Sequence, residues 1–90
     1  MDMKGIGQAG SLESNDVMVT VELLEQEDLT IELESTVKEQ FGKQIEEVTR
    51  EVLKEMKVDK AFIRIIDKGA LDFAVRARIK TAINRARRSE

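Results

Sequence analysis

Hydrophobic and polar residues alternate in two stretches near the start of the chain, residues 17–24 (VMVTVELL) and residues 29–33 (LTIEL). A period of two with many β-branched side chains is typical of strands that have one buried face. Only the short polar segment 25–28 separates them, so we expect the two strands to pair as an antiparallel hairpin. The residues expected on the buried face of the first strand are Val17, Val19, Val21 and Leu23.

A helical period follows these strands. Apolar residues recur at steps of three and four between Val37 and Met56, which predicts a long amphipathic helix. Ser35 and Thr36 offer hydroxyls that can cap its first turn, and Glu39 stands three residues after Thr36, as in a capping box. The expected apolar stripe consists of Val37, Phe41, Ile45, Val48, Val52 and Met56.

The last third of the chain predicts one more strand and one more helix. Residues 60–67 (KAFIRIID) have strand composition, and residues 67–69 (DKG) form a turn into a helix from Ala70 to about Arg87. Because a helix links the strand before it to the strand after it, those two strands should lie parallel through a right-handed crossover. The residues expected on the inner face of the second helix are Leu71, Ala74, Val75, Ala82, Ile83 and Ala86.

Together these elements predict a small α+β domain with both helices packed on one sheet. The expected architecture is an antiparallel hairpin, a β-α-β crossover and a C-terminal helix, in the order ββαβα, and residues 11–13 could add one N-terminal strand. Residues 1–10 contain three glycines and few large apolar side chains, so we expect a flexible N-terminal segment there. Residues 11–90 have the length of a single domain.

The composition removes most catalytic and metal-binding chemistry. The chain has no His, Cys, Tyr or Trp, so it lacks the usual general base, the thiol nucleophile and the preferred ligands of transition metals. We therefore expect no catalytic residue and no metal site. No apolar run approaches the roughly 20 residues that cross a bilayer, and the first residues do not resemble a secretory signal. These features predict a cytoplasmic protein without membrane contact.

Charge is distributed unevenly along the chain. Residues 1–67 carry 8 Lys/Arg against 16 Asp/Glu, whereas residues 68–90 carry 7 against 2. A basic helix of this kind can bind the phosphates of nucleic acid, so a small interaction or nucleic-acid-binding module is one alternative function. The overall acidic pI of about 5.1 makes nucleic acid the less favoured partner. Cations near a helix C-terminus also complement the macrodipole or an acidic partner surface.

Ser14 is the candidate site of chemistry in this chain. It lies in residues 13–16 (ESND), whose side chains favour tight turns, directly before an alternating strand, so we expect an exposed hydroxyl. A serine without a neighbouring His or Lys base is not an activated nucleophile by itself. It can still accept a group when another enzyme supplies the base. Turn formation alone is the competing explanation for this sequence.

Three separated segments carry a resemblance to a known family. They are residues 9–18 (AGSLESNDVM), residues 37–42 (VKEQFG) and residues 67–72 (DKGALD), the last followed by residues 76–78 (RAR). With these segments, in this order and spacing, nearly the whole chain resembles the acyl carrier protein, or gamma subunit, of bacterial citrate lyase. Asn15 stands where many members of that family have glycine, and asparagine tolerates a positive φ.

The resemblance implies a carrier rather than an enzyme. Ser14 would be linked through a phosphodiester to the prosthetic group 2'-(5''-phosphoribosyl)-3'-dephospho-CoA, whose thiol supplies what the sequence lacks. The implied partners are a prosthetic-group transferase, an alpha subunit that exchanges acetyl for citryl, and a beta subunit that cleaves the citryl thioester. The overall reaction would convert citrate to oxaloacetate and acetate. The related alternative is the carrier of a malonate decarboxylase-type complex, which uses a similar group.

Overall fold

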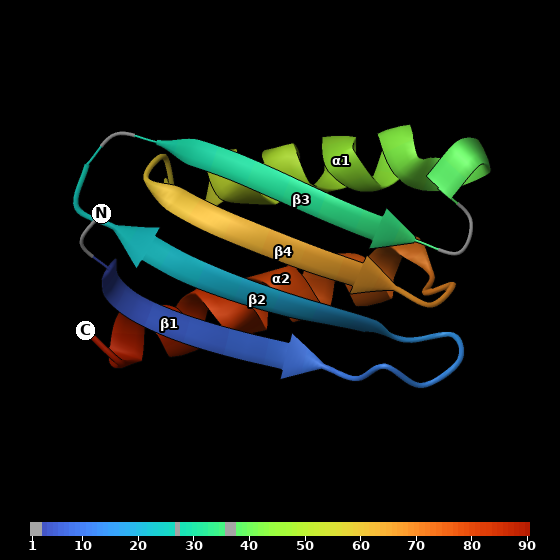
Figure 1. Ribbon diagram of the computed structural model, residues 1–90, viewed down its shortest axis with the longest axis horizontal. Coiled ribbons are helices and arrows are strands. Elements are labelled where there is room, and N and C mark those ends of the chain that lie inside the picture. Colours follow the sequence, from blue (N-terminus) through green and yellow to red (C-terminus); the bar gives the residue numbers. More distant parts are fainter. Residues whose placement is uncertain (1–2, 27, 36–37) are drawn as a thin grey trace.

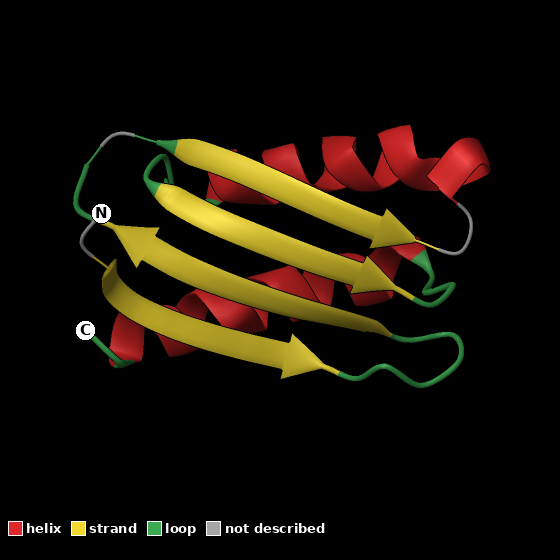
Figure 2. Ribbon diagram, viewed as in Figure 1, coloured by secondary structure: helices red, strands yellow, loops and turns green. Residues whose placement is uncertain are grey.

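The computed structural model describes residues 3–26, 28–35 and 38–90, which form one mixed sheet and two helices. Both helices lie on the same face of the sheet (Figure 1 and Figure 2). This arrangement confirms the predicted α+β class, with an extra N-terminal strand before the ββαβα order. The elements are β1 (Met3–Gly10), β2 (Val17–Leu24), β3 (Leu29–Ser35), α1 (Lys38–Glu55), β4 (Ala61–Asp67) and α2 (Asp72–Arg88).

The strand order in the sheet is β1-β2-β4-β3. Strands β3 and β4 are parallel and joined by α1, as the crossover rule predicted. The predicted hairpin between residues 17–24 and 29–33 is wrong, because β4 lies between β2 and β3 and pairs with both. A linker of four residues can reach about 13 Å, enough to pass over one strand spaced about 5 Å from each neighbour. The short linker therefore does not require β2 and β3 to pair.

Strand β1 corrects the expectation of a flexible N-terminal segment for residues 3–10; residues 1 and 2 of that prediction lie outside the described residues. The strand pairs antiparallel with β2 along the sheet edge, so the extra strand exists but lies at Met3–Gly10 and not at residues 11–13. A Cβ atom on Gly7 would come within 2.1 Å of the Ala82 carbonyl oxygen and 2.3 Å of the Ala86 nitrogen. The glycines of β1 thus allow the backbone of α2 to lie directly on the strand.

The inward face of the sheet was predicted correctly. Val17, Val19 and Val21 are fully buried and Leu23 nearly so. They pack with the inward residues of β4 and with Ile79, a core residue of α2 that the predicted inner face omitted. The buried residues of α2 are Val75, Ile79, Ala82, Ile83 and Ala86.

Two residues predicted to face inward are exposed. Phe41 of α1 is 48% exposed and Leu71, directly before α2, is 65% exposed. Val37 and Thr36 of the predicted helix start lie outside the described residues. Ser35 ends β3, and its hydroxyl donates a hydrogen bond to Asp67 Oδ2 at 2.9 Å. Neither described helix is long and apolar enough to cross a membrane.

Candidate functional site

Ser14 lies in the loop that joins β1 to β2, at the end of the sheet where β4 ends and α2 begins (Figure 1). The loop closes the β1–β2 hairpin, and Ser14 is exposed at its tip, as the turn composition predicted. Its hydroxyl makes no hydrogen bond to any residue that the structure describes. The hydroxyl is therefore open to reaction with a group from outside.

Backbone conformation at two positions shapes this loop. Asn15 has φ of 68°, in the left-handed region that asparagine tolerates better than most residues. Gly10 has φ of 95°, and a Cβ there would lie 1.7 Å from the Val17 carbonyl oxygen. Only glycine fits at that position, so the chain leaves β1 in one defined direction.

Asp16 ties the loop to both strands and to α2. Its carboxylate accepts hydrogen bonds from the Ser11 hydroxyl and the Val17 backbone N–H, each at 2.7 Å. The Arg78 guanidinium adds a two-pronged contact, with Nε 3.2 Å from Oδ1 and Nη2 3.2 Å from Oδ2. We call these four residues, Ser11, Asp16, Val17 and Arg78, the Asp16 clamp. It joins residues that are 62 positions apart in the chain.

The Asp16 clamp changes the acidity of its carboxyl group. The hydrogen bonds from Ser11 and from the Val17 backbone, assisted by Arg78, lower the pKa of Asp16 from 3.8 to about 2. Asp16 is therefore ionised at neutral pH and occupied by its donors. It is not a base for the Ser14 hydroxyl.

A second attachment joins the loop to the turn between β4 and α2. The Asn15 N–H donates to the Lys68 carbonyl at 2.8 Å, and the Lys68 N–H donates to the Asp16 carbonyl at 2.9 Å. The loop is thus held on either side of its tip while the Ser14 side chain stays exposed. A fixed backbone with an open hydroxyl suits an attachment point that another protein must recognise.

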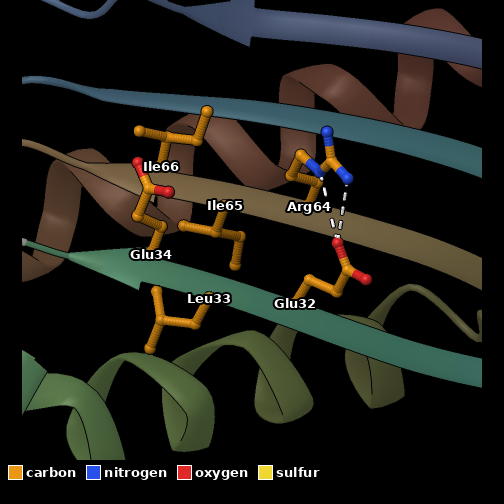
Figure 3. A pocket seen from close by; sticks show the side chains of 6 residues that line it. All are labelled: Glu32, Leu33, Glu34, Arg64, Ile65 and Ile66. Carbon is orange, nitrogen blue, oxygen red and sulfur yellow. Dashed lines mark hydrogen bonds and ion pairs between the residues drawn. The ribbon is translucent and has the colours of Figure 1, made fainter.

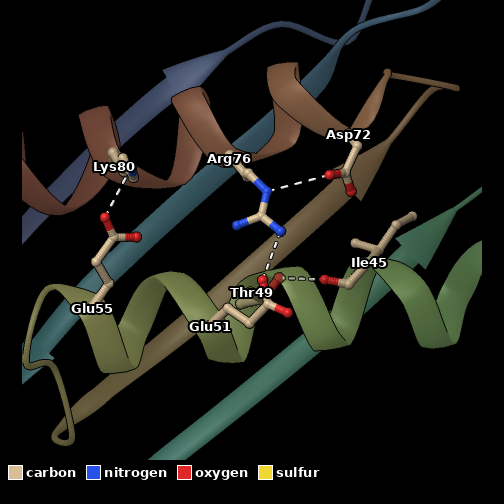
Figure 4. A network of polar contacts seen from close by, with 7 residues as sticks. All are labelled: Ile45, Thr49, Glu51, Glu55, Asp72, Arg76 and Lys80. Carbon is tan, nitrogen blue, oxygen red and sulfur yellow. Dashed lines mark hydrogen bonds and ion pairs between the residues drawn. The ribbon is translucent and has the colours of Figure 1, made fainter.

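The basic residues of α2 are used mainly inside the molecule. Figure 4 shows Arg76 between Asp72 and Glu51, and Lys80 beside Glu55, along the line where the two helices meet. The hydrogen bonds that Arg76 donates to Glu51 and, with a smaller effect, to Asp72 raise the pKa of Arg76. Two further cations of α2 bind backbone carbonyls: Arg85 binds that of Gln8 at 2.7 Å, and Arg87 binds that of Met56.

Sequence reasoning missed both the Asp16 clamp and the pairing of the helices. A signal existed for the helix pairing, because Glu51 and Glu55 on α1 have the same four-residue spacing as Arg76 and Lys80 on α2. No local signal indicates that Asp16 and Arg78 meet, although both fall in segments that carry the family resemblance.

The face of the sheet opposite the helices carries a shallow hollow of about 480 Å³ between β3 and β4. Figure 3 shows its exposed ion pair, in which Arg64 lies over Glu32 with Nη2 and Oε1 3.0 Å apart. A solvated pair of this kind contributes little and performs no chemistry by itself. Across the described ranges no three acidic side chains gather in a way that could hold a metal ion.

Comparison with known proteins agrees with this geometry. The family model described as the malonate decarboxylase delta subunit (MdcD), of acyl carrier type, matches residues 4–86. The citrate lyase acyl carrier protein of Fusobacterium nucleatum is 47% identical over 89 residues, which cover 99% of this chain and 95% of that protein. The protein of the same name from Streptococcus mutans is 48% identical over 90 residues, covering 100% and 88%.

The fold is also found in a solved structure. A chain of a Pseudomonas malonate decarboxylase hetero-tetramer, crystallised in complex with malonate, superimposes with a TM-score of 0.77 over 90% of this chain and 82% of its own. Their sequence identity is 21%, so this likeness concerns the fold alone. The identities with the two named relatives are higher and span nearly the whole chain. The chain therefore belongs to the citrate lyase acyl carrier protein family.

Proposed function

We propose that this chain is the acyl carrier subunit of citrate lyase and that Ser14 is its attachment site. Family membership supports the carrier role, and the observation that carries the residue assignment is the exposed Ser14 hydroxyl at the tip of an anchored loop. The prosthetic group we propose is 2'-(5''-phosphoribosyl)-3'-dephospho-CoA, linked to the Ser14 oxygen by a phosphodiester. Its thiol would supply the thioester chemistry that a chain without cysteine lacks.

The residues around Ser14 fit such a group because they leave the Ser14 side chain exposed and fix the backbone of the loop to which the group would be attached. Ser11, Asn15 and Asp16 fix the backbone on both sides through hydrogen bonds within the chain. The chain has no histidine, and no carboxylate of the loop bonds to the Ser14 hydroxyl, so we expect the base to come from the prosthetic-group transferase. The chain itself then performs no bond-breaking step. It presents the arm to the proposed alpha and beta subunits, and tethering keeps the acyl group at high local concentration.

Mass spectrometry of the native complex tests this proposal. Protein purified from a citrate-fermenting producer should carry a phosphodiester-linked coenzyme-type adduct on the peptide that contains Ser14. The Ser14→Ala variant should lack the adduct and the lyase activity of the complex. Its free energy of unfolding should change by less than about 0.5 kcal/mol, because the side chain is exposed. Active lyase with an unmodified Ser14 would overturn the assignment, and Ser89→Ala, at the C-terminal end of α2 and away from the loop, serves as the serine control.

A malonate decarboxylase carrier is the second candidate, favoured by the matching family model and by the fold of the Pseudomonas chain. The two candidates differ in the acyl group on the arm. Acetyl and citryl thioesters on the purified protein support citrate lyase, whereas malonyl thioesters support the decarboxylase.

A nucleic-acid-binding module is the least supported candidate. Five of the six cations of α2 contact acidic side chains or carbonyls of the same chain, which leaves Arg88 without such a contact among the described residues. Phosphate binding would have to break these contacts. Salt-dependent binding to duplex or single strands that persists in the Ser14→Ala variant would support this candidate.

A further inference from the structure

An apolar groove of about 390 Å³ opens between the first turns of the two helices. Phe41 and Ile45 of α1 form one wall, and Leu71 and Val75 form the other. Asp67 and Gly69, at the end of β4, lie at its base. The groove is therefore built at the end of the sheet that also carries the Ser14 loop.

The turn that borders the groove is bonded to the neighbours of Ser14. Lys68 exchanges backbone hydrogen bonds with Asn15 and Asp16, and the next residue, Gly69, borders the groove. A Cβ on Gly69 would lie 3.7 Å from the Asn15 side-chain oxygen. One turn thus separates the Ser14 loop from the groove, and a group fixed to Ser14 has a short path into it.

The outer residue of each wall is apolar and open to solvent, whereas the inner residue of each wall is buried. Leu71 is 65% exposed and Phe41 48% exposed, whereas Val75 is 1% exposed. The Asp67 carboxylate at the base is already satisfied, because it accepts hydrogen bonds from the Ser35 hydroxyl and the Ala70 N–H. The groove therefore presents apolar surface without an unpaired buried charge, which suits a neutral, mostly apolar ligand.

We propose that this groove binds the pantetheine part of the arm attached to Ser14 and holds the thiol end against the protein between visits to the partner subunits. This inference rests on the proposed function. Pantetheine combines a branched apolar carbon chain with neutral amides, and the Gln44 side chain on the rim can bond an amide. A volume of about 390 Å³ is at the small end for ligand sites. The groove therefore has room for the pantetheine part of the arm but not for the pantetheine and the nucleotide together. A tether also supplies the ligand at roughly millimolar effective concentration, so weak binding is sufficient.

Methyl NMR of the loaded and unloaded protein tests the proposal directly. Attachment at Ser14, verified by mass, should shift the methyl signals of Ile45, Leu71 and Val75. The methyls of Leu24 and Val58, near the opposite end of the sheet, should not move. Unchanged groove signals in fully loaded protein would overturn the groove proposal and leave the carrier function intact. Absence of any adduct on Ser14 in active lyase would overturn both.

Two exposed residues at the start of α2, two positions apart in the chain, provide a variant and its matched control. Leu71 borders the groove, whereas Phe73 is 71% exposed and does not. Leu71→Asp should fold, because Leu71 occupies the N-cap position of α2 without a side-chain cap and aspartate is a preferred cap. In the loaded protein this variant should raise the rate at which an alkylating reagent modifies the arm thiol by about fivefold, because a charged side chain in the wall weakens the binding of the arm while the tether at Ser14 is unchanged.

The Phe73→Asp variant should leave the alkylation rate within about twofold of the native rate, since its side chain lies outside the groove. The competing occupant is a partner subunit that docks on both exposed side chains. In that case both variants would weaken binding to the partner subunits while the alkylation rate of the isolated loaded protein stayed constant. That result would overturn the proposal.

Discussion

At the scale of single residues, the site divides its tasks between Ser14 and its neighbours. Ser14 is exposed and unbonded among the described residues, whereas Asp16, two positions later, accepts four hydrogen bonds. The turn composition predicted the exposure of Ser14, because the exposure follows from local side-chain chemistry, and asparagine at position 15 tolerates the positive φ found there. The Asp16 clamp was not predictable, since its partner Arg78 lies on a distant helix.

The contribution of the Asp16 clamp to the free energy of unfolding should depend on pH. Because the pKa of Asp16 falls from 3.8 to about 2 in the folded protein, the clamp stabilises the fold above pH 4. That contribution is lost as the pH falls toward 2, where the folded carboxyl takes up its proton. Urea unfolding between pH 2 and pH 6 should therefore show the native protein more stable than Asp16→Asn above pH 4, with the difference shrinking toward pH 2.

Asp59→Asn is the matched control for this measurement, because Asp59 is exposed and bonds to no described side chain. Its difference from the native protein should be small at every pH. A stability difference for Asp16→Asn that stays constant from pH 6 to pH 2 would contradict the assignment of the lowered pKa to the clamp.

At the scale of elements, the sequence predicted where strands and helices begin and end more reliably than it predicted which strands pair. The limits of β2, β4 and α2 agree with the predicted segments within about two residues, because hydrophobic periodicity is a local property. Pairing is a non-local property, and two of its features were wrong or missed. β4 inserts between β2 and β3, and the glycine-containing N-terminal segment is an edge strand under α2.

Close packing between β1 and α2 predicts that Gly7→Ala is strongly destabilising. The added methyl would meet the backbone of Ala82 and Ala86, and a backbone contact cannot be relieved by a change of rotamer. We expect a loss of about 3 kcal/mol in the free energy of unfolding, at the upper end of typical overpacking costs. Chemical denaturation measures this loss.

Lys4→Ala on the same strand provides the control, because Lys4 is exposed and its change should cost less than about 0.5 kcal/mol. Equal stability of the Gly7→Ala and Lys4→Ala variants would show that α2 does not rest on the β1 backbone.

At the scale of the whole molecule, the uneven charge along the chain becomes balanced in space. The basic second helix lies beside the first helix, and Arg76 and Lys80 pair with Glu51 and Glu55 of that helix (Figure 4). The pairs are exposed, so each contributes little to stability, but they occupy the cations that made nucleic acid a candidate partner.

Stability should be unequal across the two helices. α2 packs on β1 and on the interior strand β2, whereas α1, although it buries Ile45, Val48, Val52 and Leu53, lies over the edge strand β3, whose side chains are exposed or half-buried. Native-state hydrogen exchange should therefore show slower exchange for the amides in the middle of α2, β2 and β4 than for those of α1. Equal protection of both helices would indicate that α1 opens only with the whole domain.

The sequence by itself determined the elements from β2 onward, the inward face of β2, the absence of histidine and cysteine, and the exposed turn that carries Ser14. These properties depend on residues within a few positions of one another, and side-chain period and turn chemistry report them directly. Only the tertiary structure decided the strand order, the role of the β1 glycines, the Asp16 clamp and the groove beside the Ser14 loop. Each of these depends on which surfaces, distant in the sequence, fit together. The entropy of loop closure rises only slowly with loop length, so the same local pattern is compatible with several strand pairings.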